Sequence, residues 1–506
     1  MKDIRYRILF PLAVILFIAS SSCTKELEID STRVVGEKNM WNSLQDTRAA
    51  LMGTYGLTRA ALADHNAYWL HGELRMGSFE SLRRQDLKAV IDNNLNAAYP
   101  FVEAASNWRR FYAVVNSANI FLERVHEVKA KDPRYSDQNM AVDIAQIRLL
   151  RAFAYFYMVR VWGDVPLITT SHDGEFENKP RDSKEDILAF VEQELLAAAR
   201  DLPYQYSQND PQQAGNYYNE DSGRWAGALA RKLSAYAILA HVSAWQGKYA
   251  DAAVYAKVVL DNYTRSGHAY LNTNTLTNSN GFFMGRQNNH LFALNFLFEH
   301  LEQSFTGHIE ELTLARPVVS KLLPDIYIPK DTILSIFDEP LDERFSLDTL
   351  TGEPASERYF SAFNTSVPIF SKIKVIRNGV ADPTFRMYSS AVVFTRLEDI
   401  ALLRAEALAA LNDPAGAIEL LNSIRGLRAL PPFEEGDGDL VDAIFKERKR
   451  ELLGEGWHWY DMVRYMKIKR NSAEFQKLID EGGIYWPIAG SLLTQNPELV
   501  QTPYWK

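Results

Sequence analysis

The segment from Gln146 to Trp162 reads QIRLLRAFAYFYMVRVW, and its apolar side chains recur at helical spacing. The apolar seam consists of Ile147, Leu150, Ala154, Tyr157 and Val161. Phe153 and Phe156 widen this seam, so the predicted helix is buried on most of its circumference. Gly163 ends the helix, and Pro166 prevents it from resuming. The segment therefore predicts a long helix in the interior of the protein.

Two further segments have the pattern of helical hairpins. The first spans residues 226–262 and turns at Gly247, and the second, DIALLRAEALAALNDPAGAIELLNSIRGL, spans 399–427. Small residues that allow close helix crossing stand at the same separation in both, namely Ala240 and Ala252, and Ala405 and Ala417. This spacing resembles a tetratricopeptide repeat pair, although no strict period of roughly 34 residues joins the two hairpins.

The region between the hairpins, about 266–391, is rich in Asn, Thr, Gly and Pro and contains short alternating segments such as Val367–Ile376. This composition predicts an insertion of loops with a few short strands. We therefore expect an all-α, mainly α-helical fold in one domain over residues 39–506. Its tetratricopeptide-like scaffold would cover about 40–262 and 392–470.

The first thirty residues have the order of a bacterial secretory signal. A basic start precedes the apolar run Ile8–Ala19, and three serines lead into Cys23, the one cysteine in the sequence. This run has twelve residues, whereas a membrane-spanning helix needs about twenty, so an uncleaved anchor is the weaker interpretation. The pattern resembles a bacterial lipoprotein signal; the alternatives are an ordinary signal peptide or an unrelated cysteine. It predicts a signal peptide over 1–22, lipid attachment at Cys23 and a polar tether over 23–38.

The composition is that of a globular protein, with 47% hydrophobic and 24% charged residues. Removal of residues 1–22 would leave 52 basic and 63 acidic residues, a net charge of −11. This acidic balance argues against nucleic acid as a partner. A single cysteine also excludes a disulfide framework within the chain, so stability must come from a packed core.

Motifs of the common catalytic and cofactor-binding sites are absent from the sequence. It contains no HExxH pair, phosphate-binding loop or Gly-x-Ser-x-Gly elbow, and we expect no metal, cofactor or catalytic residue. The basic run KERKR at 446–450 alternates with Glu447 and Glu451 on one predicted helix. This arrangement favours a solvated, salt-paired face over a basic binding patch.

Several blocks of the sequence, taken together and in order, resemble the SusD/RagB family of Bacteroidetes outer-membrane lipoproteins. The blocks are NWRRFYAVVNSANIFLERV (107–125), IRLLRAFAYFYMVRVWGDVPLI (147–168), AWQGKYADA (244–252), RLEDIALLRAEAL (396–408), LLNSIRG (420–426), ERKRELLGEGWHWYDMVRY (447–465) and WPIAGSLLTQNPEL (486–499). At Gly456-Trp457-His458 the family usually shows Gly-His-Arg, which changes the polarity of one packed corner.

This resemblance implies a fold of four tetratricopeptide-like helix pairs with a variable, loop-built face that holds the ligand. It also implies a surface-exposed lipoprotein of the outer membrane that acts with a SusC-like TonB-dependent transporter. Such proteins capture oligosaccharides, or in some members peptides, and pass them to the transporter pore. The acidic residues after Cys23 loosely fit the export signal of surface lipoproteins in these bacteria.

Aromatic residues in predicted loops are the candidates for ligand binding, because rings stack on sugar faces and loops carry binding residues. The candidates are Trp69, Phe79, Arg83, Tyr99 and Phe101 in one set, and Phe282 and Phe283 in a second. For each of these rings, packing into the core is an equally good interpretation. For the cluster Trp457–Tyr460, which lies in a shared family block, core packing is the favoured interpretation.

Two other functions stay open at the level of the sequence. The first is a peptide-capturing protein of the same type. The second is an all-helical periplasmic glycoside hydrolase, because hydrolysis needs only two carboxylates at a suitable distance, and the sequence does not show distances.

Overall fold

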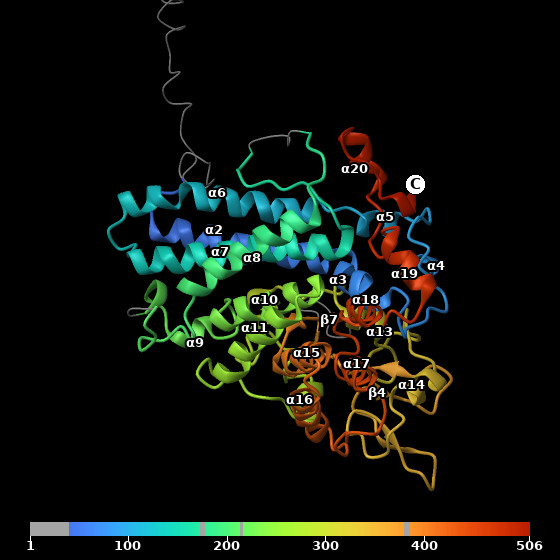
Figure 1. Cartoon of the computed structure of the whole chain (residues 1–506). Coiled ribbons are helices and arrows are strands. Elements are labelled where there is room, and N and C mark those ends of the chain that lie inside the picture. The colour runs from blue at the N-terminus through green and yellow to red at the C-terminus, as the bar shows by residue number, and fades with distance from the viewer. Residues whose placement is uncertain (1–39, 173–177, 213–215, 379–384) are drawn as a thin grey trace, which may run out of the picture.

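The computed structural model describes residues 40–172, 178–212, 216–378 and 385–506. The predicted signal peptide (1–22), lipidation site (Cys23) and tether (23–38) lie outside the described residues. Long helices dominate the described structure, and its strands are few and short (Figure 1). The prediction of an all-α, mainly helical fold is confirmed.

Four long helices lie side by side in the upper part of Figure 1. They are α2 (Leu44–Ala63), α6 (Arg109–Lys131), α7 (Asp137–Trp162) and α8 (Lys184–Asp201). Helix α7 contains the apolar segment Gln146–Trp162, and it packs against the other three helices. It begins where the Ser136 hydroxyl accepts the Asn139 N–H at 3.1 Å, and it ends at Gly163 with φ of 73°. From Ile147 onward nearly every side chain of α7 is buried, as the widened apolar seam predicts.

A second group of helices continues the stack below the first (Figure 1). It consists of α10 (Lys232–Gln246), α11 (Tyr249–Asn262), α15 (Leu397–Ala410), α16 (Pro414–Leu427), α17 (Leu440–Glu451) and α18 (His458–Lys469). Helix α11 packs against α15, so the two predicted hairpins meet although the insertion separates them in sequence. The four small residues at the predicted crossings, Ala240, Ala252, Ala405 and Ala417, are all fully buried.

The insertion between α11 and α15 contains short helices and pairs of short strands. The helices are α12 (Thr273–Thr277), α13 (Ile309–Thr313) and α14 (Lys330–Ile336). The antiparallel pairs are β1 (Phe292–Leu294) with β8 (Val392–Thr395), β2 (Ser346–Leu347) with β3 (Pro354–Ser356), β4 (Phe360–Ser361) with β5 (Ile369–Phe370), and β6 (Ile376–Asn378) with β7 (Arg386–Tyr388). Short helices elsewhere are α3 (Ala67–Trp69), α4 (Gln85–Ile91), α5 (Pro100–Ala105), α9 (Ser222–Trp225), α19 (Ala473–Asp480) and α20 (Gly490–Gln495).

The expectation of a solvated face at 446–450 is wrong for most of that run. Arg448, Arg450, Glu447 and Glu451 are all buried in ion pairs. The insertion covers Arg450, because α14 packs on α17 and the Arg450 Nε donates to the Ile336 carbonyl at 2.7 Å. Arg448 pairs instead with Asp399 of α15 and Asp461 of α18. The interleaved charges are therefore part of the interior, where each needs a partner of opposite sign.

Candidate ligand-binding surface

The structure places the predicted ligand residues in two different environments. The rings of Trp69, Phe79, Phe282 and Phe283 are only 1–2% exposed. Trp69 donates its indole N–H to the Gly454 carbonyl at 3.2 Å, and Phe79 packs edge-on against Phe370. These four rings therefore fill the core. Core packing is the second interpretation that the sequence leaves open for each of them.

The buried cluster at the start of α18 also belongs to the core. Trp457, Trp459 and Tyr460 are 1–2% exposed, which confirms the favoured interpretation. The guanidinium of the buried Arg160 lies over the Trp457 and Tyr460 rings, with its Cζ 5.3 and 4.1 Å from their centroids. These rings hold α7 and α18 together and face no solvent.

Tyr99, Phe101 and Arg83, in contrast, lie at the surface. Tyr99 precedes α5 and is 37% exposed, Phe101 is half-buried, and Arg83 is exposed. Pro100 at the first helical position starts α5 and so sets the positions of Tyr99 and Phe101. The Phe101 ring meets the exposed His65 ring edge-on, with 6.2 Å between centroids.

His65 is exposed at a kink between α2 and α3. His65 and Asn66 both adopt left-handed backbone conformations, each with φ of 56°. The Asn66 side chain donates to the His308 carbonyl at 3.2 Å, which fixes the kink against the insertion. Asp64, the residue before His65, forms an ion pair with Arg110 of α6.

Arg84 supplies a fixed positive group beside Phe101. Its Cζ lies 5.2 Å from the centre of the Phe101 ring, a cation–π distance. Two hydrogen bonds to Asp86, of 2.8 and 2.6 Å, hold the guanidinium in place. The same bonds keep the pKa of Asp86 below its usual value. Arg84 can therefore present its remaining N–H groups in one orientation.

Three phenylalanines of the insertion are also exposed. Phe305 and Phe385 are 54% and 46% exposed, and their rings meet edge-on with 5.6 Å between centroids. Phe298 is 39% exposed, and the Arg377 guanidinium lies over its ring. Ser304 pairs with Tyr388 through two backbone hydrogen bonds, which brings Phe305 beside the β6–β7 hairpin.

Gly307 joins this part of the insertion to the end of α2. Its φ is +79°, and a Cβ atom at this position would lie 2.9 Å from the Ala63 carbonyl oxygen. Only glycine combines this conformation with such a close approach. We call the whole region the aromatic loop surface, defined by His65, Arg84, Tyr99, Phe101, Phe298, Phe305 and Phe385.

Rings with free faces next to fixed hydrogen-bond donors suit ligands that have both apolar and hydroxylated sides. Of these residues, the sequence predicts Tyr99 and Phe101 as ligand contacts. It does not point to Phe305 and Phe385, although the signal at Phe282 and Phe283, an aromatic residue in a polar loop, applies to them equally. Whether a loop ring points inward or outward depends on contacts between segments far apart in sequence.

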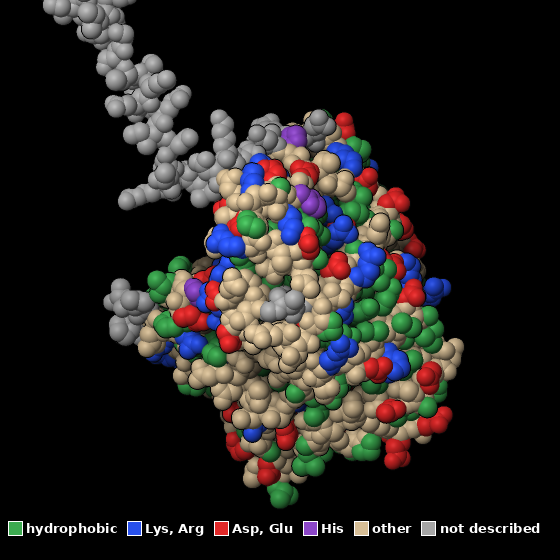
Figure 2. Space-filling model, turned by 90° about the vertical axis from the view of Figure 1, so that its left-hand side faces the viewer, with side chains coloured by type: hydrophobic (Ala, Val, Ile, Leu, Met, Phe, Trp, Pro, Cys, Tyr) green, Lys and Arg blue, Asp and Glu red, His purple; other side chains and the backbone are tan. Residues whose placement is uncertain are grey.

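The residues that the structure describes contain no group of three His, Cys, Asp or Glu side chains placed to hold a metal ion. They also contain no helix with the length and hydrophobicity needed to cross a bilayer. On the face shown in Figure 2, Lys and Arg side chains lie interspersed with Asp and Glu, as on an ordinary solvated surface.

Two family models match separate parts of the chain. The SusD family model matches residues 348–477, and a model described as starch-binding associating with outer membrane matches residues 79–217. A crystal structure of a SusD superfamily protein from Bacteroides thetaiotaomicron is 45% identical, with a TM-score of 0.85 over 92% of this chain and all of that one. The chain belongs to the SusD/RagB family.

Other relatives extend this SusD similarity along nearly the full sequence. A SusD-like protein of Formosa agariphila is 25% identical, and the match covers 99% of each chain. A SusD-like protein of Bacteroides ovatus is 29% identical over 75% of this chain and 67% of its own length. The recognised blocks therefore mark a SusD scaffold, and the aromatic loop surface is built on the segments that connect its helices.

Proposed function

We propose that this SusD-like protein is a non-enzymatic surface lipoprotein of the outer membrane that captures oligosaccharides. In this proposal it delivers them to a SusC-like TonB-dependent transporter. The observation that carries the proposal is the aromatic loop surface, where several rings keep open faces on a folded scaffold. Exposed rings are costly in water, and sugar rings cover them with their own apolar faces.

The location and partner are inferred from the family. One matching family model is described as associating with the outer membrane, and the N-terminal sequence has the order of a lipoprotein signal ending at Cys23. More than one acyl chain is needed for stable anchorage, a requirement that a bacterial lipoprotein meets. Tethered capture beside a transporter raises the local concentration of the ligand at the pore.

The charged groups beside the aromatic loop surface support binding rather than hydrolysis. Asp64, Asp86 and Glu302 each form an ion pair with an arginine, namely Arg110, Arg84 and Arg59. Arg84 keeps the pKa of Asp86 below its usual value, whereas a glycosidase needs one carboxyl group that stays protonated. These carboxylates are suited to orienting arginine donors toward a ligand.

Calorimetric titration with a panel of oligosaccharides and peptides tests the proposal. We expect an oligosaccharide to bind, and the double substitution Phe305→Ala with Phe385→Ala to weaken binding about tenfold, because two stacking faces are lost. Leu350→Ala, which removes another exposed apolar side chain of the insertion, should leave affinity unchanged.

Three results would contradict the proposal. Binding of peptides alone would identify a peptide-capturing protein. Release of reducing sugar that persists after repurification, and is lost on substitution of one Asp or Glu, would identify a hydrolase. If the double variant and the unchanged protein bound the oligosaccharide with equal affinity, Phe305 and Phe385 would not be part of the binding surface.

A further inference from the structure

The basic run 446–450 contains one cation whose environment differs from that of its neighbours. Lys446 pairs with Asp338 at 2.7 Å, and Arg448 and Arg450 are buried in ion pairs. The Lys449 ammonium has no ion-pair or hydrogen-bond partner among the residues that the structure describes. Lys449 is exposed, and partial desolvation by its surroundings lowers its pKa, while the charge of Glu73 acts in the opposite direction.

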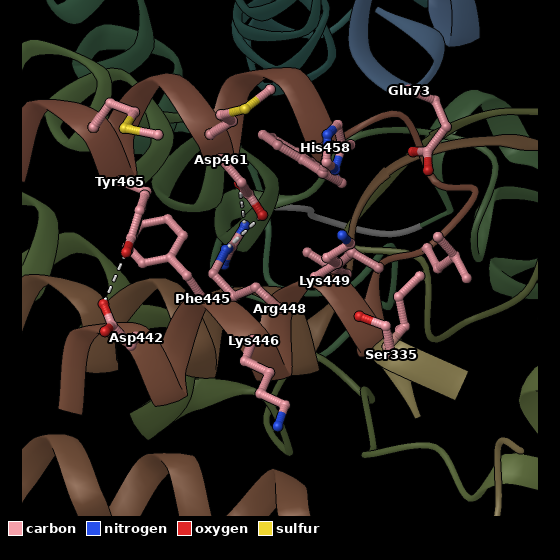
Figure 3. A pocket seen from close by; sticks show the side chains of 16 residues that line it. Glu73, Ser335, Asp442, Phe445, Lys446, Arg448, Lys449, His458, Asp461 and Tyr465 are labelled. Atoms are coloured by element: carbon pink, nitrogen blue, oxygen red, sulfur yellow. Dashed lines mark hydrogen bonds and ion pairs between the residues drawn. The ribbon is translucent and has the colours of Figure 1, made fainter. Parts of the chain in front are cut away.

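Lys449 borders a cavity of about 390 Å³ between α17, α18 and α14. Figure 3 shows the side chains that line it. The apolar walls are Phe445, Leu452, Leu453, Trp457, Met462 and Met466. This volume lies in the usual range for small-molecule sites, and the two flexible methionines let the walls adapt to ligand shape.

Four polar residues lie on one side of this cavity. In Figure 3, Lys449, His458, Glu73 and Ser335 lie together, away from Tyr465 and Asp442. Glu73 is tied to the scaffold by the N–H groups of Gly454 and Gly456, each at 2.9 Å, and burial raises its pKa to about 7. Lys449 therefore lies near a carboxyl group that is only partly ionised at neutral pH and already hydrogen-bonded.

His458 adds a neutral ring to the same side. Its Nε2 lies 3.1 Å from the Met76 carbonyl, which can only accept, so Nε2 carries the hydrogen. Burial and the nearby Lys449 charge lower the pKa of His458 to about 4, so the ring is uncharged at neutral pH. Lys449 is thus the one strong positive group available to a ligand among the described residues that line this side.

We propose that the cavity between α17 and α18 binds a small organic anion with an apolar body, a hydrophobic carboxylate or sulfonate, with Lys449 as its ion-pair partner. The apolar walls would enclose the body, and the anion would supply the partner that Lys449 lacks. A free sugar fits this site poorly, because its hydroxyl groups would meet apolar walls. The site shares no residue with the aromatic loop surface and does not depend on the proposed function.

Two fluorescent probes of the same shape test this proposal on the purified protein. Anilinonaphthalene sulfonate carries the anion, and N-phenylnaphthylamine has the same aromatic body without it. Lys449→Met should weaken binding of the sulfonate about tenfold and leave the neutral probe unchanged, because only the charge-assisted contact is lost. Lys446→Met is the matched control, since it removes an ammonium that borders the same cavity but is already paired with Asp338.

Filling the cavity should abolish binding of both probes. Met462→Trp places an indole inside it, and Ser335→Trp, on the exposed face of α14, covers its polar side if the first variant does not fold. The proposal is overturned if Lys449→Met binds the sulfonate as the unchanged protein does. It is also overturned if Lys446→Met loses as much affinity, or if a folded filled variant still binds both probes.

Discussion

Tyr157 lies at the centre of the helical scaffold, with its ring stacked on Phe111 at 4.9 Å between centroids. His71 Nε2 donates to the Ala105 carbonyl at 2.9 Å, so its Nδ1 is free to accept the Tyr157 hydroxyl at 3.2 Å. One residue thus joins α7, α6 and the π-helical turn Leu70–Leu74 that leads toward the aromatic loop surface.

Tyr157→Asp should unfold the protein or lower its free energy of unfolding by about 4 kcal/mol, because it buries a charge without a partner. Tyr157→Phe keeps the ring and leaves only His71 Nδ1 unpaired, so it should cost about 1–2 kcal/mol. Chemical denaturation monitored by circular dichroism measures both. A Tyr157→Asp variant as stable as Tyr157→Phe would show that the ring is not part of the core.

Glu310 makes the stability of the insertion depend on pH. It is fully buried, accepts hydrogen bonds from Ser390 Oγ at 2.8 Å and from the Val375 N–H at 3.1 Å, and burial raises its pKa from 4.5 to about 7. Because the folded-state pKa lies above the unfolded value, proton binding favours the folded state. This stabilisation is fully present below about pH 4.5 and is lost as the pH rises through 7.

Glu310→Gln should remove this pH dependence. Between pH 4.5 and 8 the free energy of unfolding of the unchanged protein should fall by up to about 3 kcal/mol more than that of the variant. The reason is that folding raises the pKa of Glu310 from 4.5 to about 7. Thermal melting of both proteins across this range gives the difference. Parallel curves would mean that the pKa of Glu310 is the same in the folded and unfolded states.

Helix α17 carries charged residues that a surface helix would expose, and here the fold buries them. Glu451 lies within 2.6 to 3.0 Å of the guanidinium groups of Arg428, Arg396 and Arg344. Burial alone would raise the pKa of Glu451, and these arginines hold it well below its usual value. The three arginines come from segments far apart in sequence, so Glu451 connects the insertion to the helical stack.

Glu451→Gln should destabilise the protein by about 3–5 kcal/mol, because the buried arginines would lose their shared counter-charge. Glu435→Gln, at an exposed position in the loop before α17, is the control and should change stability by less than about 0.5 kcal/mol. Urea titration at neutral pH compares the two variants. An equal, small effect in both would show that the network contributes little to stability.

The elements that could be predicted from the sequence are those whose signal is local. The seam of Ile147 to Val161 and the small residues of the two hairpins depend only on helical spacing, and the structure confirms them. The burial of Arg450, and the difference between the buried Phe283 and the exposed Phe305, depend on how the insertion packs back onto the scaffold. Two loop phenylalanines in similar polar surroundings give the same sequence signal, whichever way they point.

At the scale of the whole molecule, rigid helices and exposed loop rings are separated in space. The helical stack supplies the buried contacts, and the aromatic loop surface is assembled from the kink after α2, the segment before α5 and the insertion (Figure 1). If a ligand binds at this surface as proposed, rings held by a folded scaffold would lose little entropy on binding. Tethering such a molecule to a membrane would place its ligand beside a transporter.

Cys23→Ala tests the tether independently of ligand binding. We expect the variant to lose lipid labelling and to leave the outer-membrane fraction, because the acyl chains provide the membrane affinity. Cell fractionation with metabolic labelling by a palmitate analogue measures both properties. Lipid labelling that persists in the variant would contradict attachment at Cys23.

Capture at the aromatic loop surface is tested most directly by a crystal structure of the protein with the oligosaccharide that binds best in the panel. We expect a sugar ring to lie against Phe101 or against the Phe305–Phe385 pair, with a hydroxyl group near Arg84. An oligosaccharide bound at another surface, with these rings still facing solvent, would contradict the proposed binding surface.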